Sequence, residues 1–259
     1  MGRQESESLT TSVHLVERQM LFYEERRKLI RQHTVDEPAG PYNFITISRD
    51  IGALGDAVAS ETAKRLKWNV YDKEIVDYIA TNSKVRHNLV DQLDERTQSL
   101  IYDSVDGLLR ILQSQSFSNE EYHVALIKAL ATLAAQGHAI LLGHGGAFVL
   151  QGQPGLHVRI TASLPARIRR LSKKWSISDE KTRKTVLKTD AERRVFIRRH
   201  FNQDKDDIRF FHLVFNTDYL TVDRIAAAIT GVVEQSRQQV PISLPVESFD
   251  FQSSESIRA

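Results

Sequence analysis

The strongest constraint on the fold is a regular alternation of short apolar runs with longer segments of helical pattern. Two of the runs, Phe44 to Ile47 and Ala139 to Leu142, contain almost no polar residue. Strands of this composition are buried on both faces, as in parallel sheets whose connections are helices. Shorter runs of the same kind occupy 69–71, 157–160 and 213–215. We therefore predict an α/β fold with three layers, in which helices flank a parallel sheet.

The segments between the apolar runs predict the helices. Apolar residues recur at helical spacing from Ala57 to Leu66 and from Val222 to Val233. The other expected helices span 73–80, 85–136 with a break near 115–119, 165–175 and 179–200.

Both ends of the chain differ from this pattern. Residues 1–41 predict an amphipathic helix, with Val13 and Val16 on its apolar face, and then a linker that contains two prolines and a glycine. Residues 237–259 are rich in Ser and Gln and predict a flexible C-terminal tail. The main domain is therefore expected at 42–236. The N-terminal helix either packs on that domain or pairs with a second chain, which leaves a homodimer through this helix open.

Composition excludes several classes of protein. The chain contains no cysteine, which rules out disulfide scaffolds, thiolate nucleophiles and iron–sulfur clusters. No apolar run approaches the roughly 20 residues of a membrane-spanning helix, and the first residues lack an apolar signal core. We expect a cytoplasmic protein with no membrane partner. A net charge of +2 over 259 residues is too small for a general polyanion binder.

The segment after the first expected strand, Ser48 to Ala57, has the sequence SRDIGALGDA. A strand, a glycine turn and a helix N-terminus together direct backbone N–H groups toward an anion, commonly phosphate. The P-loop pattern GxxxxGK[ST] is not met, because the lysine and the hydroxyl are missing. Two-glycine turns also occur in α/β proteins that bind nothing there, so this segment alone leaves both interpretations open.

Two further segments carry candidate binding groups. Gly143 to Gly146 follows another expected strand and contains His144, which suits a phosphate; a glycine-rich turn with a solvent-facing histidine is the alternative. Residues 165–200 contain 13 basic and 4 acidic side chains, a local charge of +9. Arginine forms bidentate hydrogen bonds to phosphate oxygens, whereas a solvated basic face and a nucleic-acid surface are the other interpretations.

Four blocks of the sequence together resemble the cytidylate kinase-like family of P-loop nucleoside monophosphate kinases. The blocks are ITISRD from Ile45 with Gly52, Gly55 and Ala59, YDKEI from Tyr71, LGHG from Leu142, and KTDAER from Lys188. They occur in the family's order over roughly 42–235. The resemblance implies a P-loop kinase-like domain with an arginine-rich helical lid at about 176–205. It also implies ATP and Mg²⁺ as cofactors and a nucleoside monophosphate as the acceptor, with CMP or dCMP the family's choice.

The resemblance implies roles for individual residues as well. The turn and two arginines of a later helix would bind ATP: Ser48, Gly52, Ala53, Leu54, Gly55, Asp56, Ala57, Arg167 and Arg170. The acceptor would contact Asp72, His144 and Gly145. The catalytic group would comprise Arg49, Asp190, Arg193, Arg194 and Arg198, the last two by proximity to the lid motif only. The magnesium ligands stay open among Asp50, Asp56, Asp72 and the phosphates themselves.

Several positions depart from ordinary nucleoside monophosphate kinases. Gly55 occupies the position of the P-loop lysine and Ala57 that of the hydroxyl. This branch of the family shares the loss of the lysine and has an arginine ahead of the turn, here Arg49, which we hypothesise supplies the missing charge. Leu54 replaces a small residue, and His144 replaces an arginine. Since the loss of one transition-state cation can cost about 10³-fold in rate, a slow or inactive enzyme follows as an alternative.

Two other functions therefore stand beside the enzyme. One is a degenerate kinase domain that binds a nucleotide and acts as a sensor or regulator through its N-terminal helix. The other is a basic protein associated with nucleic acid. The basic segment has few aromatic side chains on which bases could stack, so we expect no nucleic-acid partner.

Overall fold

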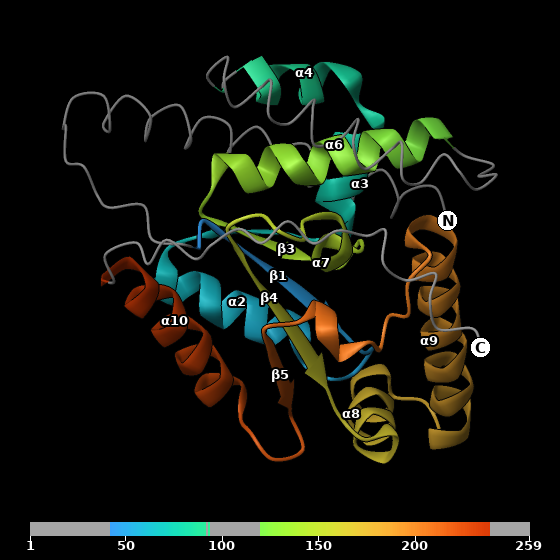
Figure 1. Cartoon of the computed structure of the whole chain (residues 1–259). Helices are drawn as coiled ribbons and strands as arrows, with labels where there is room; N and C mark the ends of the chain where they lie inside the picture. The colour runs from blue at the N-terminus through green and yellow to red at the C-terminus, as the bar shows by residue number, and fades with distance from the viewer. Residues whose placement is uncertain (1–41, 92, 94–119, 239–259) are drawn as a thin grey trace, which may run out of the picture.

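The computed structural model of the chain describes residues 42–91, 93 and 120–238 (Figure 1). The predicted N-terminal helix, positions 94–119 of the long helical segment and nearly all of the predicted tail lie outside the described residues. Within the part of the chain that is described, no helix is both long and apolar enough to span a membrane.

Five parallel strands form a sheet in the order β2-β3-β1-β4-β5. The strands are β1 (Phe44–Arg49), β2 (Asn69–Tyr71), β3 (Ala139–Leu142), β4 (Gly155–Thr161) and β5 (Leu213–Asn216). The central strand β1 pairs on both sides, so that Ile45 lies opposite Ile140 of β3 and Leu156 of β4. The parallel sheet predicted from the apolar runs is confirmed. Strand β1 runs two residues further than predicted, because Ser48 and Arg49 still pair with β4.

Helices cover both faces of this sheet (Figure 1). On one face lie α2 (Gly55–Leu66) and α10 (Val222–Gln238), and on the other lie α3 (Lys73–Thr81), α4 (Ser83–Asp91) and α6 (Glu120–Gln136). Successive side chains of a strand point to opposite faces. Ile45 and Ile47 accordingly belong to the core under α2 and α10, whereas Phe44 belongs to the core under α3 and α6. The predicted three-layer fold is therefore confirmed.

The elements that shape the site follow β3 and β4. They are α7 (Gly146–Val149), α8 (Leu164–Trp175), α9 (Asp179–Phe201) and the short 3-10 helix η1 (Ile208–Phe210). The arginine-rich helix α9 stands beside the sheet (Figure 1). A hydrophobic cluster holds it against α7, and its buried members are Ala147, Phe148, Ile197, Phe201 and Phe211. The cluster fixes which side of α9 faces the sheet.

Candidate functional site

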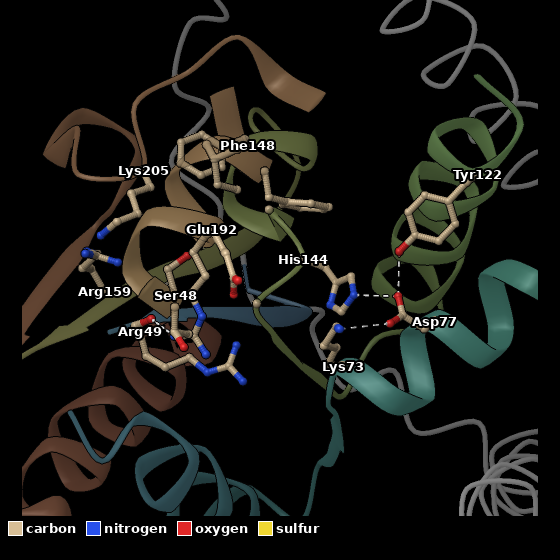
Figure 2. A pocket seen from close by; sticks show the side chains of 16 residues that line it. Ser48, Arg49, Lys73, Asp77, Tyr122, His144, Phe148, Arg159, Glu192 and Lys205 are labelled. Carbon is tan, nitrogen blue, oxygen red and sulfur yellow. Dashed lines mark hydrogen bonds and ion pairs between the residues drawn. The ribbon is translucent and has the colours of Figure 1, made fainter. Parts of the chain in front are cut away.

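A cavity of about 460 Å³ lies beyond the carboxyl ends of β1 and β3, where ligands bind in open parallel sheets. Its walls come from β1, β4, α3, α6, α7, α9, the turn after β3 and the segment before η1. Five of the side chains that line it are cations, namely Arg49, Lys73, Arg159, Arg193 and Lys205, and two are carboxylates, Asp77 and Glu192. Figure 2 shows Arg159 and Lys205 at one end, His144, Asp77 and Tyr122 at the other, and Arg49 between them.

The turn between β1 and α2 has the backbone form of an anion site. Gly52 has a φ of +78°, and Leu54, the N-cap of α2, has a φ of +63° and makes no side-chain capping hydrogen bond. The amide of Val58 donates to the carbonyl of Leu54 at 3.0 Å, so the amides of residues 55–57 precede the intrahelical bonds. The side chain of Leu54 is exposed to solvent. The helix N-terminus is thus free of a protein cap.

Arg49 fills the space beside this turn. Its Nε donates to Asp56 Oδ1 at 3.1 Å and its Nη1 donates to the carbonyl of Leu142 at 3.3 Å. A Cβ atom added at Gly55 would lie 2.5 Å from Arg49 Cβ, and one added at Gly143 would collide with the guanidinium. The two glycines therefore make room for Arg49. Position 55 therefore has no room for a lysine while Arg49 occupies this space.

A second guanidinium meets Arg49 in the cavity. Arg193 of α9 donates from Nη1 to the main-chain carbonyl of Arg49 at 2.9 Å. Burial lowers the pKa of Arg193 below its ordinary value, and the positive charge of Arg49 lowers it further. Like charges repel when they are brought together in a partly buried site, and a bound anion relieves that repulsion. The pair of arginines is suited to a phosphoryl group.

Both carboxylate oxygens of Asp50 are hydrogen-bonded to protein groups in a buried network. Its Oδ1 accepts from Arg159 Nη2 at 2.8 Å and from Lys205 Nζ at 3.2 Å, and its Oδ2 accepts from the hydroxyl of Thr161 at 2.8 Å. Burial raises the pKa of Asp50, but Arg159 and Lys205 outweigh it and leave the pKa below its usual value. In the described ranges no group of three His, Cys, Asp or Glu side chains could hold a metal ion.

The opposite end of the cavity is organised around Asp77. Its Oδ1 accepts from the hydroxyl of Tyr122 at 2.7 Å and lies 2.8 Å from Nε2 of His144, while Lys73 Nζ lies 3.8 Å from its Oδ2 (Figure 2). Burial raises the pKa of Asp77, but the hydrogen bonds from His144 and Tyr122 bring it below its usual value. Burial together with Asp77 raises the pKa of Tyr122. His144 sits in a left-handed turn with a φ of +55°.

The other predicted acceptor residues lie close by, in different roles. Asp72 is the N-cap of α3 and accepts from the amide of Ile75 at 3.2 Å, and it does not line the cavity. Gly145 does line it. A Cβ atom at position 145 would collide with the ring of Phe201, so the glycine lets α9 approach the turn after β3.

Two arginines predicted to bind ATP instead donate hydrogen bonds to main-chain carbonyls of the turn. Arg167 donates from Nη1 to Asp190 Oδ2 at 2.7 Å and to the carbonyl of Ile51 at 3.4 Å. Arg170 donates to the carbonyl of Gly52 at 3.4 Å and to Thr217 at 2.8 Å. Arg167 and Arg170 do not line the cavity, nor does Asp190. They connect the turn to α8 and α9.

Two predicted catalytic residues of α9 are turned away. Arg194 and Arg198 line a separate cavity of about 510 Å³, and Arg194 donates to Asp206 Oδ2 at 3.3 Å. Residues advance by about 100° along a helix, so the face that carries Arg193 cannot also carry Arg194 or Arg198. Proximity in the sequence therefore did not place these two residues in the site with Arg193.

Sequence reasoning missed several residues that line the site. Lys73 and Asp77 have helical i, i+4 spacing, which could have been noticed from the block after Asp72. Tyr122, Arg159 and Lys205 come from segments without a recognisable motif, and no local signal would have found them.

Comparisons with known proteins agree with this architecture. The model of the cytidylate kinase-like family matches residues 44–219. A cytidylate kinase of Sulfolobus acidocaldarius is 25% identical over 111 residues, which are 43% of this chain and 61% of the relative. A cytidylate kinase of Staphylothermus marinus is 27% identical over 103 residues, 39% of this chain and 58% of the relative. The chain thus spans about three fifths of the length of these curated relatives.

Among solved structures, an uncharacterized protein from Eubacterium ventriosum has a TM-score of 0.55 at 14% identity. The match covers 74% of this chain and 98% of that protein. At this identity the likeness concerns the fold alone.

Proposed function

The chain belongs to the cytidylate kinase-like family, and on that basis we propose that it transfers the γ-phosphoryl group of ATP to a nucleoside monophosphate, with CMP or dCMP as the acceptor. The relatives that carry the name cytidylate kinase support this choice of acceptor.

The observation that carries the proposal is the meeting of Arg49 and Arg193 beside an uncapped helix N-terminus. Phosphoryl transfer requires two aligned nucleotides and cations around the group in transit, and it needs little covalent chemistry from the protein. The amides of the turn would bind the ATP phosphates. Arg49 and Arg193 would bind the transferred group between the two nucleotides, because both side chains line the cavity.

The acceptor fits the end of the cavity that contains Lys73 and His144. The Nδ1 atom of His144 is buried and has no hydrogen-bond partner among the described residues, while Nε2 is held by Asp77. A buried polar atom without a partner is costly unless a ligand satisfies it. We therefore assign the acceptor phosphate to Lys73 and to His144 with a proton on each ring nitrogen, so that Nε2 donates to Asp77 and Nδ1 donates to the phosphate. His144 takes the place of the family's arginine with Asp77 as its support.

The side chains near the turn fit Mg²⁺ that is held mainly by phosphate oxygens and water, a common arrangement for this ion. Asp50 and Asp72 already bond to protein groups. Asp56 accepts from Arg49 through Oδ1, but its side chain is 77% exposed, so it is the more accessible carboxylate of the turn. When bound, the ion neutralises charge on the phosphates.

The experiment measures ATP consumption with each common nucleoside monophosphate, and calorimetric ATP binding on the same sample. We expect turnover with CMP or dCMP above the other acceptors. Replacement of Arg193 by Met should lower kcat/KM by about 10²- to 10³-fold, because a cation is lost from the transition state.

Arg183→Met is the matched control, since Arg183 is an exposed arginine of the same helix. It should leave kcat/KM within about twofold of the wild type. ATP binding without turnover for any acceptor would favour the sensor over the kinase. Absence of ATP binding would contradict both.

A further inference from the structure

Lys205 is a lysine that the family motifs do not include, and it reaches the point where β1 passes into the turn. It lies between α9 and η1 in the chain. Its side chain is only 9% exposed and lines the same cavity as Arg49 and Arg193. Nζ lies 3.2 Å from Asp50 Oδ1 and 2.7 Å from Asp206 Oδ1.

Three cations from three segments of the chain converge at this point. Arg193 of α9 bonds to the carbonyl of Arg49, and Lys205 bonds to the carboxylate of Asp50, the next residue. Asp50 also begins the turn, since its carbonyl accepts from the amide of Ala53 at 3.1 Å. Lys205 is therefore fixed to the same few residues that position the phosphate-binding turn.

The charges around Lys205 explain how it stays buried. Arg159 bonds to the same two carboxylates, Asp50 and Asp206, so two cations face two anions. A buried ammonium group is tolerated when it is paired in this way. The group has three N–H donors, of which two are used by these carboxylates. The third donor remains for a ligand in the cavity that Lys205 lines.

We propose that Lys205 is a catalytic residue whose ammonium group binds the transferred phosphoryl group and supplies the amino cation that the turn lacks. This role rests on the proposed kinase activity. An oxygen of the acceptor phosphate forms a bond to the γ-phosphorus, the bond to the β,γ-bridging oxygen breaks, and ADP leaves with that electron pair. Lys205 donates a hydrogen bond to a γ-oxygen and transfers no proton.

The test compares Lys205→Gln with the wild type in the full-length chain. Affinity is measured for ADP alone and for the complex of ADP, Mg²⁺, aluminium fluoride and CMP. In this complex the aluminium fluoride takes the place of the γ-phosphoryl group during transfer. We expect ADP affinity within about twofold, and affinity for the fluoride complex and kcat each lower by about 10²- to 10³-fold. Lys205→Arg should recover part of the loss. Lys184→Gln, an exposed lysine of α9, is the control and should change neither quantity.

A merely structural ion pair predicts a different result. Lys205→Gln would then lower the melting temperature but bind the fluoride complex as the wild type does, and this result would overturn the proposal. If Lys205→Gln does not fold, the wild-type protein still provides a measurement through the NMR signal of the Lys205 ammonium group, assigned with Lys205→Arg. The signal should shift with the fluoride complex and not with ADP alone, and an unmoved signal would contradict the role.

The two proposals fail in distinguishable ways. If the wild type binds ATP and turns over while Lys205→Gln matches it, only the role of Lys205 is overturned. If the wild type binds neither ATP nor the fluoride complex, the kinase proposal fails and the role of Lys205 fails with it.

Discussion

Arg49 and Gly55 are the pair of residues whose dependence on each other is clearest. The sequence alone allows the idea that a lysine at position 55 would repair the turn. The structure contradicts this, because any side chain at position 55 begins 2.5 Å from Arg49 Cβ. The side chain of Arg49, at the end of β1, fills the space that the first side-chain atoms of a lysine at position 55 would need.

A Gly55→Ala substitution tests this crowding. We expect a loss of about 1–3 kcal/mol in the free energy of unfolding, because one of two packed groups must shift. Gly231→Ala is the matched control, since a Cβ atom at that position of α10 meets nothing within 4 Å. The control should gain about 0.5–1 kcal/mol from the removal of a helical glycine. Urea unfolding of both variants measures the difference, and equal effects would contradict the crowding.

His157 predicts how stability depends on pH. Burial, and then the charge of His212, lowers the pKa of His157 to about 4. In the unfolded chain the pKa is about 6.5, so the unfolded state binds more protons between these values. The contribution of this residue is fully present above pH 6.5 and is lost as the pH falls toward 4. Asp50 and Asp77, with pKa values below the usual 3.8, lose their contributions only at lower pH.

We therefore expect His157→Asn to reduce the loss of stability between pH 7.5 and pH 4.5 by about 2 kcal/mol. Urea unfolding at the two pH values measures it. His87→Asn, at an exposed position of α4, serves as the control substitution. A wild-type-like pH dependence in His157→Asn would contradict the assignment.

At the scale of the elements, helix α9 decides which arginines reach the cavity. Its position depends on Phe201, which is buried, belongs to the cluster with Phe148 and covers Gly145. Aromatic side chains in such clusters contribute most of the contact area between elements. The helix should loosen when that ring is removed.

Phe201→Ala should cost about 3–5 kcal/mol in stability, as is usual for a buried aromatic residue. We also expect hydrogen exchange to accelerate at the amides of α9 more than at those of α10, and the KM for the acceptor to rise. Val195→Ala, at an exposed position of the same helix, should change stability by less than about 0.5 kcal/mol. Uniform acceleration of exchange across all helices would contradict a local effect on α9.

The elements were predicted well because their signals are local. Continuous apolar runs such as Ala139 to Leu142 identified the strands, and the boundaries of α8 and α9 agree within one or two residues. The contacts of the site depend on packing instead. Lys205 and Asp50 are 155 residues apart, and the pattern of neither segment indicates the other. Which face of α9 meets the sheet likewise depends on Phe201 and its cluster, so the sequence could not tell whether Arg193 or Arg198 faces the cavity.

At the scale of the whole molecule, the described residues form a hydrophobic core on each face of the sheet. One core joins α2 and α10 to the strands, and the other joins α3 and α6 to them. A domain is expected to fold by itself when its core is closed by its own elements.

We accordingly expect a chain limited to residues 42–238, with 94–119 retained, to unfold cooperatively like the full chain. Circular dichroism during thermal unfolding checks this expectation, and size-exclusion chromatography compares the apparent mass of both chains. The same number of chains per particle for both, after allowance for the 62 residues removed, would remove the idea of a dimer through the N-terminal segment. Loss of cooperative unfolding would mean that the removed ends belong to the core.

The position of Arg49 between Gly55 and Gly143 also limits how this type of turn could diverge in evolution. Exchange between the arginine form and the lysine form is disfavoured one substitution at a time, because one intermediate crowds two side chains into the same space. The other intermediate has neither cation. Descendants of each form would then stay separate even where both bind the same nucleotides, and the residue ahead of the turn would identify their lineage.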